Sequence, residues 1–171
     1  MAKMGADSLK NNLTNPARVY LWEVLFANPI GGGDGDVLEL RCQTTAIPGR
    51  SVGSILIPFK GTAGIAFPGK VAFSHEWACT FVEGTDGAVF DALYQWFEQI
   101  SEAQSGQGSP DSLVKTDLYL SLIDQEGVVY RLIKLVGCYV KTMDDTTLPY
   151  GEEGAVMFNA TFSYDRWEKK S

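Results

Sequence analysis

Alternating apolar and polar side chains recur along the chain and predict a mainly β protein. Residues 37–45 predict a strand with one apolar and one polar face. The polar face of this strand consists of Glu39, Arg41 and Gln43. Residues 154–167 predict a final strand, whose polar face includes Asn159, Thr161 and Ser163. Residues 18–27 are instead apolar on both alternating faces, so they predict a strand that is covered on both sides.

A long strand is predicted over residues 71–83. It places the only histidine of the chain, His75, on one face with Phe73 and Trp77. A single histidine on an apolar face predicts a packed core residue, because no second histidine is present to form a metal pair or a proton relay.

One segment has the period of an amphipathic helix. Residues 87–103 predict this helix, and Thr85 or Asp86 is expected to cap its N-terminus. Its apolar stripe consists of Val89, Leu93, Trp96, Phe97 and Ile100. An aromatic stripe at this spacing predicts core packing rather than a cofactor site.

The remaining pattern sets the fold class. Residues 113–124 and 128–142 predict a hairpin that turns at 125–127. The chain therefore has about seven predicted strands and one helix, which favours an antiparallel β-barrel or β-sandwich with one flanking helix. A length of 171 residues suits a single domain over 1–171. Residues 1–16 are polar and predict a flexible N-terminal arm.

Glycine and proline interrupt the pattern in the first half of the chain. Residues 28–36 predict a turn between strands, and residues 54–60 predict a short edge strand. A loop is predicted from Gly61 to Lys70, with candidate contact residues Gly61, Gly64, Ile65, Phe67 and Pro68. Ile65 and Phe67 either fold back onto the core or insert into a neighbouring subunit, and the pattern supports both alternatives equally.

Composition excludes several classes of function. The formal net charge of −7 disfavours a strong nucleic-acid binder, which needs clustered lysine and arginine. No apolar run is long enough to cross a bilayer, and the first residues lack the apolar segment of a signal peptide. Cys42, Cys79 and Cys138 lie in apolar segments and are expected to be reduced core residues. We expect no metal, no cofactor and no catalysis, because one histidine without a nucleophile motif disfavours a hydrolase.

The order of several segments resembles the tail tube proteins of contractile-tailed bacteriophages. The segments that carry this resemblance are LRCQTTAIPG, IPFKG, FSHEWACTFVEG, ALYQWFEQI and FNATFSYDRWE. The resemblance extends from about Arg18 to Glu168. It implies a barrel-like subunit with a flanking helix, hexameric rings whose inner strands join into one barrel, and stacking of these rings into a tube.

The resemblance also implies partners and a location. The tube would contact a sheath protein, a tape-measure protein, a baseplate tube initiator and a tail terminator, and DNA would pass through it without sequence-specific binding or membrane insertion. It would belong to the virion tail and assemble in the host cytoplasm. Tubes of contractile injection systems, type VI secretion tubes and tube-initiating baseplate proteins share this fold and are alternatives. A monomeric β-sandwich that binds a ligand is a second alternative.

The polar strand faces and the glycine-rich loop are the candidate assembly sites. We expect Glu39, Arg41 and Gln43 to line the lumen of the tube beside Asn159, Thr161 and Ser163 of the final strand. A lumen with few clustered lysines and arginines would not hold DNA phosphates. The alternative for these residues is an outer face in contact with solvent. The loop from Gly61 to Lys70 is expected to bridge successive rings.

Overall fold

The computed structural model describes residues 6–13, 15–27, 34–151 and 153–170, and within these ranges it contains nine strands and four helices. The strands are β1 (Trp22–Phe26), β2 (Cys42–Thr45), β3 (Arg50–Phe59), β4 (Thr62–Phe73), β5 (Glu76–Val82), β6 (Thr116–Ile123), β7 (Val129–Met143), β8 (Met157–Ser163) and β9 (Arg166–Lys170). The helices are α1 (Ala6–Asn12), α2 (Asp34–Arg41), α3 (Ala88–Ile100) and α4 (Asp111–Val114). This mainly antiparallel β architecture confirms the predicted fold class.

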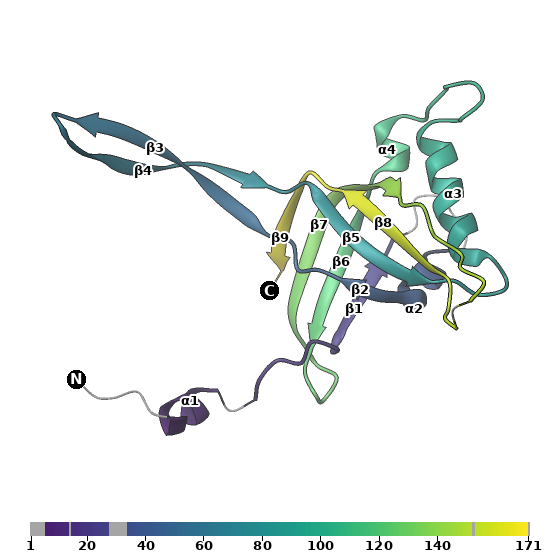
Figure 1. Cartoon of the computed structure of the whole chain (residues 1–171), viewed down its shortest axis with the longest axis horizontal. Helices are drawn as coiled ribbons and strands as arrows, with labels where there is room; N and C mark the ends of the chain where they lie inside the picture. Colours follow the sequence, from purple (N-terminus) through teal and green to yellow (C-terminus); the bar gives the residue numbers. More distant parts are fainter. Residues whose placement is uncertain (1–5, 14, 28–33, 152, 171) are drawn as a thin grey trace.

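Seven of the strands form one antiparallel sheet in the order β1-β6-β7-β8-β5-β2, with β9 paired to β7. Strand β7 is shared by two parts of this sheet: residues 132–136 pair with β9, and residues 139–143 pair with β8. The sheet folds into a sandwich-like arrangement with α3 against one side, and it does not close into a barrel (Figure 1). Strands β1 and β2 form the two ends of the strand order, so each has neighbouring strands on one side only.

An aromatic cluster fills the core between the strands and α3. The ring of Phe162 lies 5.4 Å from that of Phe26, 6.0 Å from Trp77 and 5.6 Å from Trp96. Trp96 is on α3, and it is buried together with Val89 and Leu93 of the same stripe, which confirms the predicted core face of this helix. The alternation predicted for the final strand is confirmed within β8, since Ala160 and Phe162 are buried while Asn159 is exposed and Thr161 is half-buried. The predicted extent of 154–167 is wrong, because β8 ends at Ser163 and a separate strand, β9, begins at Arg166.

The strand predicted over residues 37–45 is wrong in its first part. Residues 34–41 form α2, and only Cys42–Thr45 form a strand. Leu38 packs into the core, but Leu40, which belonged to the predicted apolar face, is 84% exposed. The carboxylate of Glu39 accepts a hydrogen bond of 2.8 Å from the backbone N–H of Phe26 in β1. Tertiary contacts with β1 therefore decide the conformation of this segment against its local alternation. The turn predicted at 28–36 falls largely outside the described residues, and its last residues begin α2.

The long strand predicted over residues 71–83 is divided in two. His75 has a φ of 57°, in the left-handed region, and an extended strand cannot continue through such a residue. Strand β4 therefore ends at Phe73, and β5 begins at Glu76. The prediction of a core histidine is wrong, because His75 is exposed at this corner and its Nδ1 lies 2.9 Å from the carbonyl oxygen of Tyr164.

The predicted loop from Gly61 to Lys70 is a strand. Strands β3 and β4 form a separate two-stranded sheet that extends away from the rest of the molecule (Figure 1). They are joined by a two-residue turn in which Lys60 has a φ of 23° and Gly61 a φ of 69°. Two central residues with positive φ are typical of a tight β-hairpin.

Candidate assembly surfaces

The outer face of β8 is polar and continues onto β5. Asn159 lies opposite Thr80, and Thr161 lies opposite Ala78. The hydroxyl of Thr80 donates a hydrogen bond of 2.9 Å to Oδ1 of Asn159. Ser163 pairs with Glu76 at the end of the two strands. The structure therefore brings the three predicted residues of β8 together on one polar sheet face, at whose end Glu76 forms an ion pair of 2.5 Å with Lys141.

The other three residues of the predicted lumen set do not share a face of one strand. Gln43 is exposed on β2, the edge strand that pairs with β5, whereas Glu39 and Arg41 belong to α2. Arg41 forms ion pairs of 3.2 Å with Glu83 and 2.5 Å with Asp86. Its charge is thus already matched by two carboxylates.

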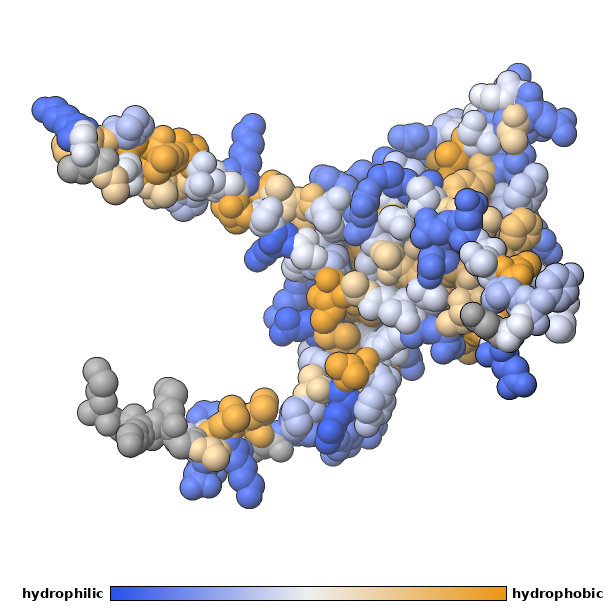
Figure 2. Space-filling view, in the orientation of Figure 1, coloured by the Kyte–Doolittle hydropathy of each residue, from blue (hydrophilic) through white to orange (hydrophobic). Residues whose placement is uncertain are grey.

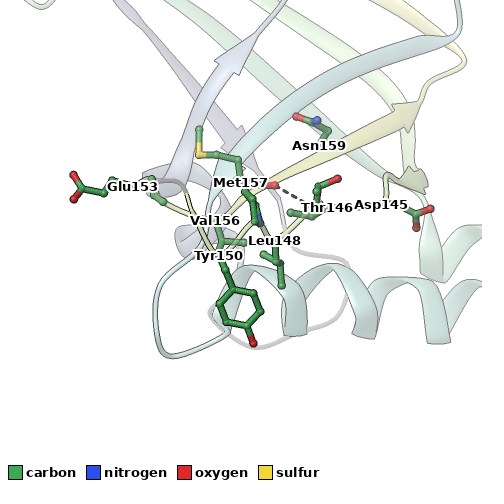
Figure 3. Close-up of a pocket in the computed structure, with 12 residues that line it drawn as sticks. Asp145, Thr146, Leu148, Tyr150, Glu153, Val156, Met157 and Asn159 are labelled. Atoms are coloured by element: carbon green, nitrogen blue, oxygen red, sulfur yellow. Dashed lines mark hydrogen bonds between the residues drawn. The ribbon is translucent and has the colours of Figure 1, made fainter.

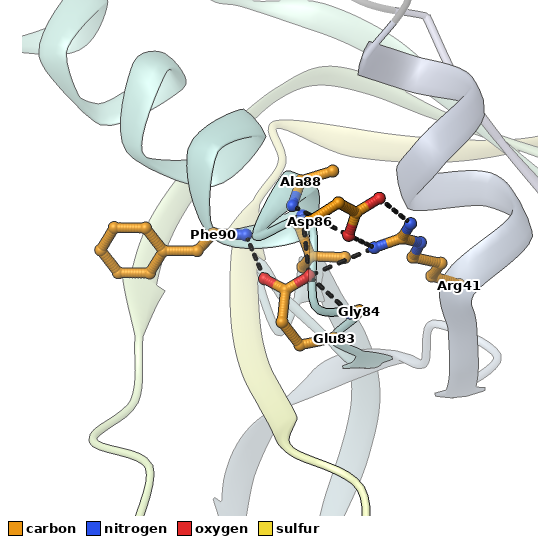
Figure 4. Close-up of polar contacts among 7 residues, drawn as sticks. Arg41, Glu83, Gly84, Asp86, Ala88 and Phe90 are labelled. Atoms are coloured by element: carbon orange, nitrogen blue, oxygen red, sulfur yellow. Dashed lines mark hydrogen bonds and ion pairs between the residues drawn. The ribbon is translucent and has the colours of Figure 1, made fainter.

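Glu83, Arg41 and Asp86 connect the end of β5 to α2 and α3 (Figure 4). The carboxylate of Glu83 accepts hydrogen bonds of 3.2 Å from the backbone N–H of Val89 and 2.8 Å from that of Phe90, in the first turn of α3. The expected capping by Thr85 or Asp86 is therefore replaced mainly by Glu83, which comes from the preceding strand. The hydrogen bond from Arg41 lowers the pKa of Asp86 to about 2.

A Glu83→Gln variant is expected to be destabilised by about 1–2 kcal/mol, because hydrogen bonds to a charged acceptor and a negative charge at a helix N-terminus both stabilise the fold. Urea unfolding followed by circular dichroism measures this loss. Glu126→Gln, at the exposed β6–β7 turn, is the matched control and should unfold as the wild type does. Equal stability of all three proteins would show that Glu83 does not hold the helix.

The β3–β4 hairpin exposes large apolar side chains along much of its length. Its exposed apolar residues are Val52, Ile55, Leu56, Ile57, Phe59, Ile65, Phe67 and Val71. Ile55 lies opposite Phe67, and Ile57 lies opposite Ile65. Ile65 and Phe67 are 54% and 47% exposed, so within the subunit they do not fold back onto its core. Figure 2 shows apolar residues along this projection.

The base of the hairpin is attached to β9. The indole N–H of Trp167 donates a hydrogen bond of 3.1 Å to the carbonyl oxygen of Gly49. The guanidinium of Arg50 lies 5.4 Å from the centre of the Trp167 ring, and the ring of Phe73 lies 6.4 Å from it. These contacts hold the start of β3 and the end of β4, whereas in the described part of the chain the two strands pair only with each other.

Strand β1 leaves a second apolar surface open. Residues 18–27 were predicted to be covered on both sides, but in the subunit Leu25 is 50% exposed and only Val24 and Phe26 are buried. A groove of about 630 Å³ runs between β1 and the α2–β2 segment, with Val19, Trp22, Leu40 and Gln43 among its lining residues. An open strand edge beside an apolar groove is suited to contact with another chain.

Among the described residues, no cluster of three or more histidine, cysteine, aspartate or glutamate residues could hold a metal ion. No helix in the described ranges is long and apolar enough to span a membrane. Cys42, Cys79 and Cys138 are free thiols, and burial raises the pKa of Cys138 to about 12. Cys79 and Cys138 are buried and Cys42 is half-buried.

The sequence profile of the phage tail tube protein family matches residues 15–170. This match covers the sheet, the hairpin and α3. A comparison with curated protein sequences found no significant match.

Solved structures with a similar fold include tube, cap and terminator proteins of the anti-feeding prophage and of an extracellular contractile injection system. The tube-terminating cap of the anti-feeding prophage superposes with a TM-score of 0.68 at 14% identity, over 92% of each chain. The sheath–tube complex of an extracellular contractile injection system gives a TM-score of 0.66 at 14% identity, over 99% of each chain. The sheath/tube terminator of that system gives a TM-score of 0.69 at 14% identity, over 92% of this chain and 98% of the other. At this level of identity the likeness establishes the fold.

Proposed function

Because the chain belongs to the phage tail tube protein family, we propose that it is a structural, non-catalytic subunit that forms hexameric rings and that these rings stack into the inner tube of a contractile phage tail. The tube would conduct DNA into the host without binding it sequence-specifically. One observation supports this assignment best. The sheet carries a polar face on β5 and β8, and its two terminal strands, β1 and β2, each lack a neighbouring strand on one side.

The open edges give a physical reason for ring formation. An unpaired strand edge exposes backbone N–H and C=O groups, and pairing with an identical neighbour satisfies them. When each subunit uses two different edges, the contacts are heterologous and close into a ring if the rotation permits. In such a ring the faces of β5 and β8 would line the channel, with Asn159, Thr161 and Ser163 in its wall. Gln43 would lie in the groove beside β1, and Glu39 and Arg41 would lie on α2, outside this wall.

The projecting parts are assigned to contacts between subunits. We propose that the β3–β4 hairpin bridges successive rings, and that residues 1–16 form an arm that packs on a neighbouring subunit. Helix α1 is exposed along its whole length, as expected of a segment that still lacks its packing partner. The outer surface of the tube would meet a sheath protein, its ends a baseplate initiator and a tail terminator, and its lumen a tape-measure protein. It would assemble in the host cytoplasm and remain in the virion tail.

Electron microscopy of the purified protein at high concentration tests the assignment. Rings and tubes are expected to form without metal or cofactor. A strictly monomeric protein, even with sheath and baseplate partners present, would refute the assignment and favour the ligand-binding sandwich. The DNA content of purified particles distinguishes a phage tail from a contractile injection system. The position of the protein, along the whole tube or only at the baseplate, distinguishes a main tube protein from an initiator.

A Thr161→Lys variant tests the assignment of the lumen. It adds one positive charge per subunit on the polar sheet face, and a ring of such charges would attract DNA phosphates. Virions with this variant are expected to assemble but to eject DNA more slowly, and the difference should shrink as salt rises. Gln104→Lys, in the exposed loop after α3, is the control and should eject at the wild-type rate. A normal rate for Thr161→Lys at low salt would place this face outside the channel.

A further inference from the structure

The β3–β4 hairpin is basic although the protein as a whole is acidic. Residues 50–73 contain Arg50, Lys60 and Lys70 and no carboxylate, whereas the whole chain has a formal net charge of −7. Arg50 packs on Trp167 at the base of the hairpin. Lys60 and Lys70 form no ion pair within the described residues. The hairpin therefore combines an exposed apolar surface with two positive charges for which the described residues supply no ion-pair partner.

A groove of about 760 Å³ complements the hairpin, because it combines apolar lining residues with acidic neighbours (Figure 3). It is formed by the segment between β7 and β8 and the start of β8. Its apolar lining includes Leu148, Tyr150, Val156 and Met157, each more than a third exposed. The hydroxyl of Thr146 donates a hydrogen bond of 3.1 Å to the carbonyl oxygen of Met157, which joins the two sides of this segment.

The charge around this groove is opposite to that of the hairpin. The described residues between 144 and 157 include three carboxylates, Asp144, Asp145 and Glu153, and no lysine or arginine. The exposed side chains of Asp144, Asp145 and Glu153 form no ion pair within the described part of the chain. Helix α3 beside it likewise contains Asp91 and Glu98 and no basic residue.

The two surfaces lie at opposite ends of the molecule. In Figure 1 the tip of the hairpin is at the far left, and the segment between β7 and β8 runs down the right-hand side, past α3. A contact between them cannot form within one subunit. Between copies it is heterologous, and it can be repeated in one direction without limit.

We propose that the groove of residues 144–157 is the docking site for the β3–β4 hairpin of a second copy in the adjacent ring. The apolar hairpin residues would cover Leu148, Val156 and Met157, while Lys60 and Lys70 would face the carboxylates at the rim. This inference rests on the proposed tube and adds the receiving surface and its electrostatic selectivity. It gives the stack of rings a direction, since every ring presents hairpins at one end and grooves at the other.

Charge reversal on each side, alone and combined, tests the pairing. One variant carries Lys60→Glu and Lys70→Glu, the second carries Asp144→Lys, Asp145→Lys and Glu153→Lys, and the third carries all five changes. All positions are exposed, so circular dichroism should show wild-type folding for each. The first two variants are expected to raise the protein concentration needed for tubes about tenfold or more, because each places like charges together. The third restores opposite charges and should form tubes again. Glu126→Lys, at the distant β6–β7 turn, is the control and should assemble normally.

The possible outcomes separate this inference from the proposed function. Loss of tubes in both single-sided variants with recovery in the combined variant supports the pairing. Normal tubes from the groove variant, or no recovery in the combined one, would place the hairpin on another surface, while the tube itself would stand. If the wild type forms neither rings nor tubes, the proposed function fails first.

Discussion

A Phe67→Asp variant is expected to fold as the wild type does and to form no long tubes. Phe67 is 47% exposed on β4, opposite Ile55, and packs against little of its own subunit beyond the hairpin. Burying such a side chain at an interface contributes about 1.5–3 kcal/mol, and a ring repeats the contact in every subunit. An aspartate there removes this contribution and places a carboxylate in an apolar contact. Light scattering and electron microscopy measure the loss of tubes.

Two comparisons make this result interpretable. Phe67→Leu keeps an apolar side chain of similar reach and should still form tubes. Circular dichroism and thermal unfolding of Phe67→Asp should match the wild type. If this variant unfolds, Phe67 supports the subunit itself. If it forms normal tubes, the hairpin does not carry the contact between rings.

A Phe162→Ala variant is expected to lose about 3–5 kcal/mol of stability, the range for removing a large aromatic side chain from a packed core. Phe162 is fully buried, and its ring lies within 6.3 Å of the rings of Phe26, Trp77, Phe81 and Trp96. The cavity would lie where β1, β5, β8 and α3 meet, and these elements would not close over it because each is fixed by its own strand or helix partners.

Denaturant unfolding measures this loss. Because a small domain is stable by only about 5–15 kcal/mol, the variant is expected to unfold at a clearly lower denaturant concentration than the wild type. Leu40→Ala removes an apolar side chain that is 84% exposed and should unfold as the wild type does. A loss below about 1 kcal/mol for Phe162→Ala would mean that the aromatic cluster is not a packed core.

The sequence predicts an element correctly where the period of its apolar residues matches the face that the fold buries. The alternation around Ala160 and Phe162 and the helical stripe through Val89, Leu93 and Trp96 both correspond to buried faces. The three polar residues of β8 were found by the same signal. The segment around Glu39 has the alternation of a strand but forms a helix, because its contacts with β1 and with Glu83 at the end of β5 outweigh a weak local preference.

The hairpin could not be predicted from its composition. Its prolines and glycines indicate a loop, yet both prolines lie where the pairing is irregular. Pro58 falls within a shift of register between Ile57 and Phe59, and Pro68 lies opposite Ser54, next to a second shift. A proline at such a bulge costs no regular strand hydrogen bond, so a long hairpin tolerates it. His75 gave no local signal of the left-handed backbone that ends β4.

Strand β7 belongs to both parts of the folded sheet, which has a mechanical consequence. Its first half is hydrogen-bonded to β9, which holds the base of the hairpin, and its second half is hydrogen-bonded to β8 in the polar face. A pull or push on the hairpin that enters β9 through the Trp167 contacts would therefore reach the polar face along one continuous backbone. We infer that β7 spreads such a load over both parts of the sheet.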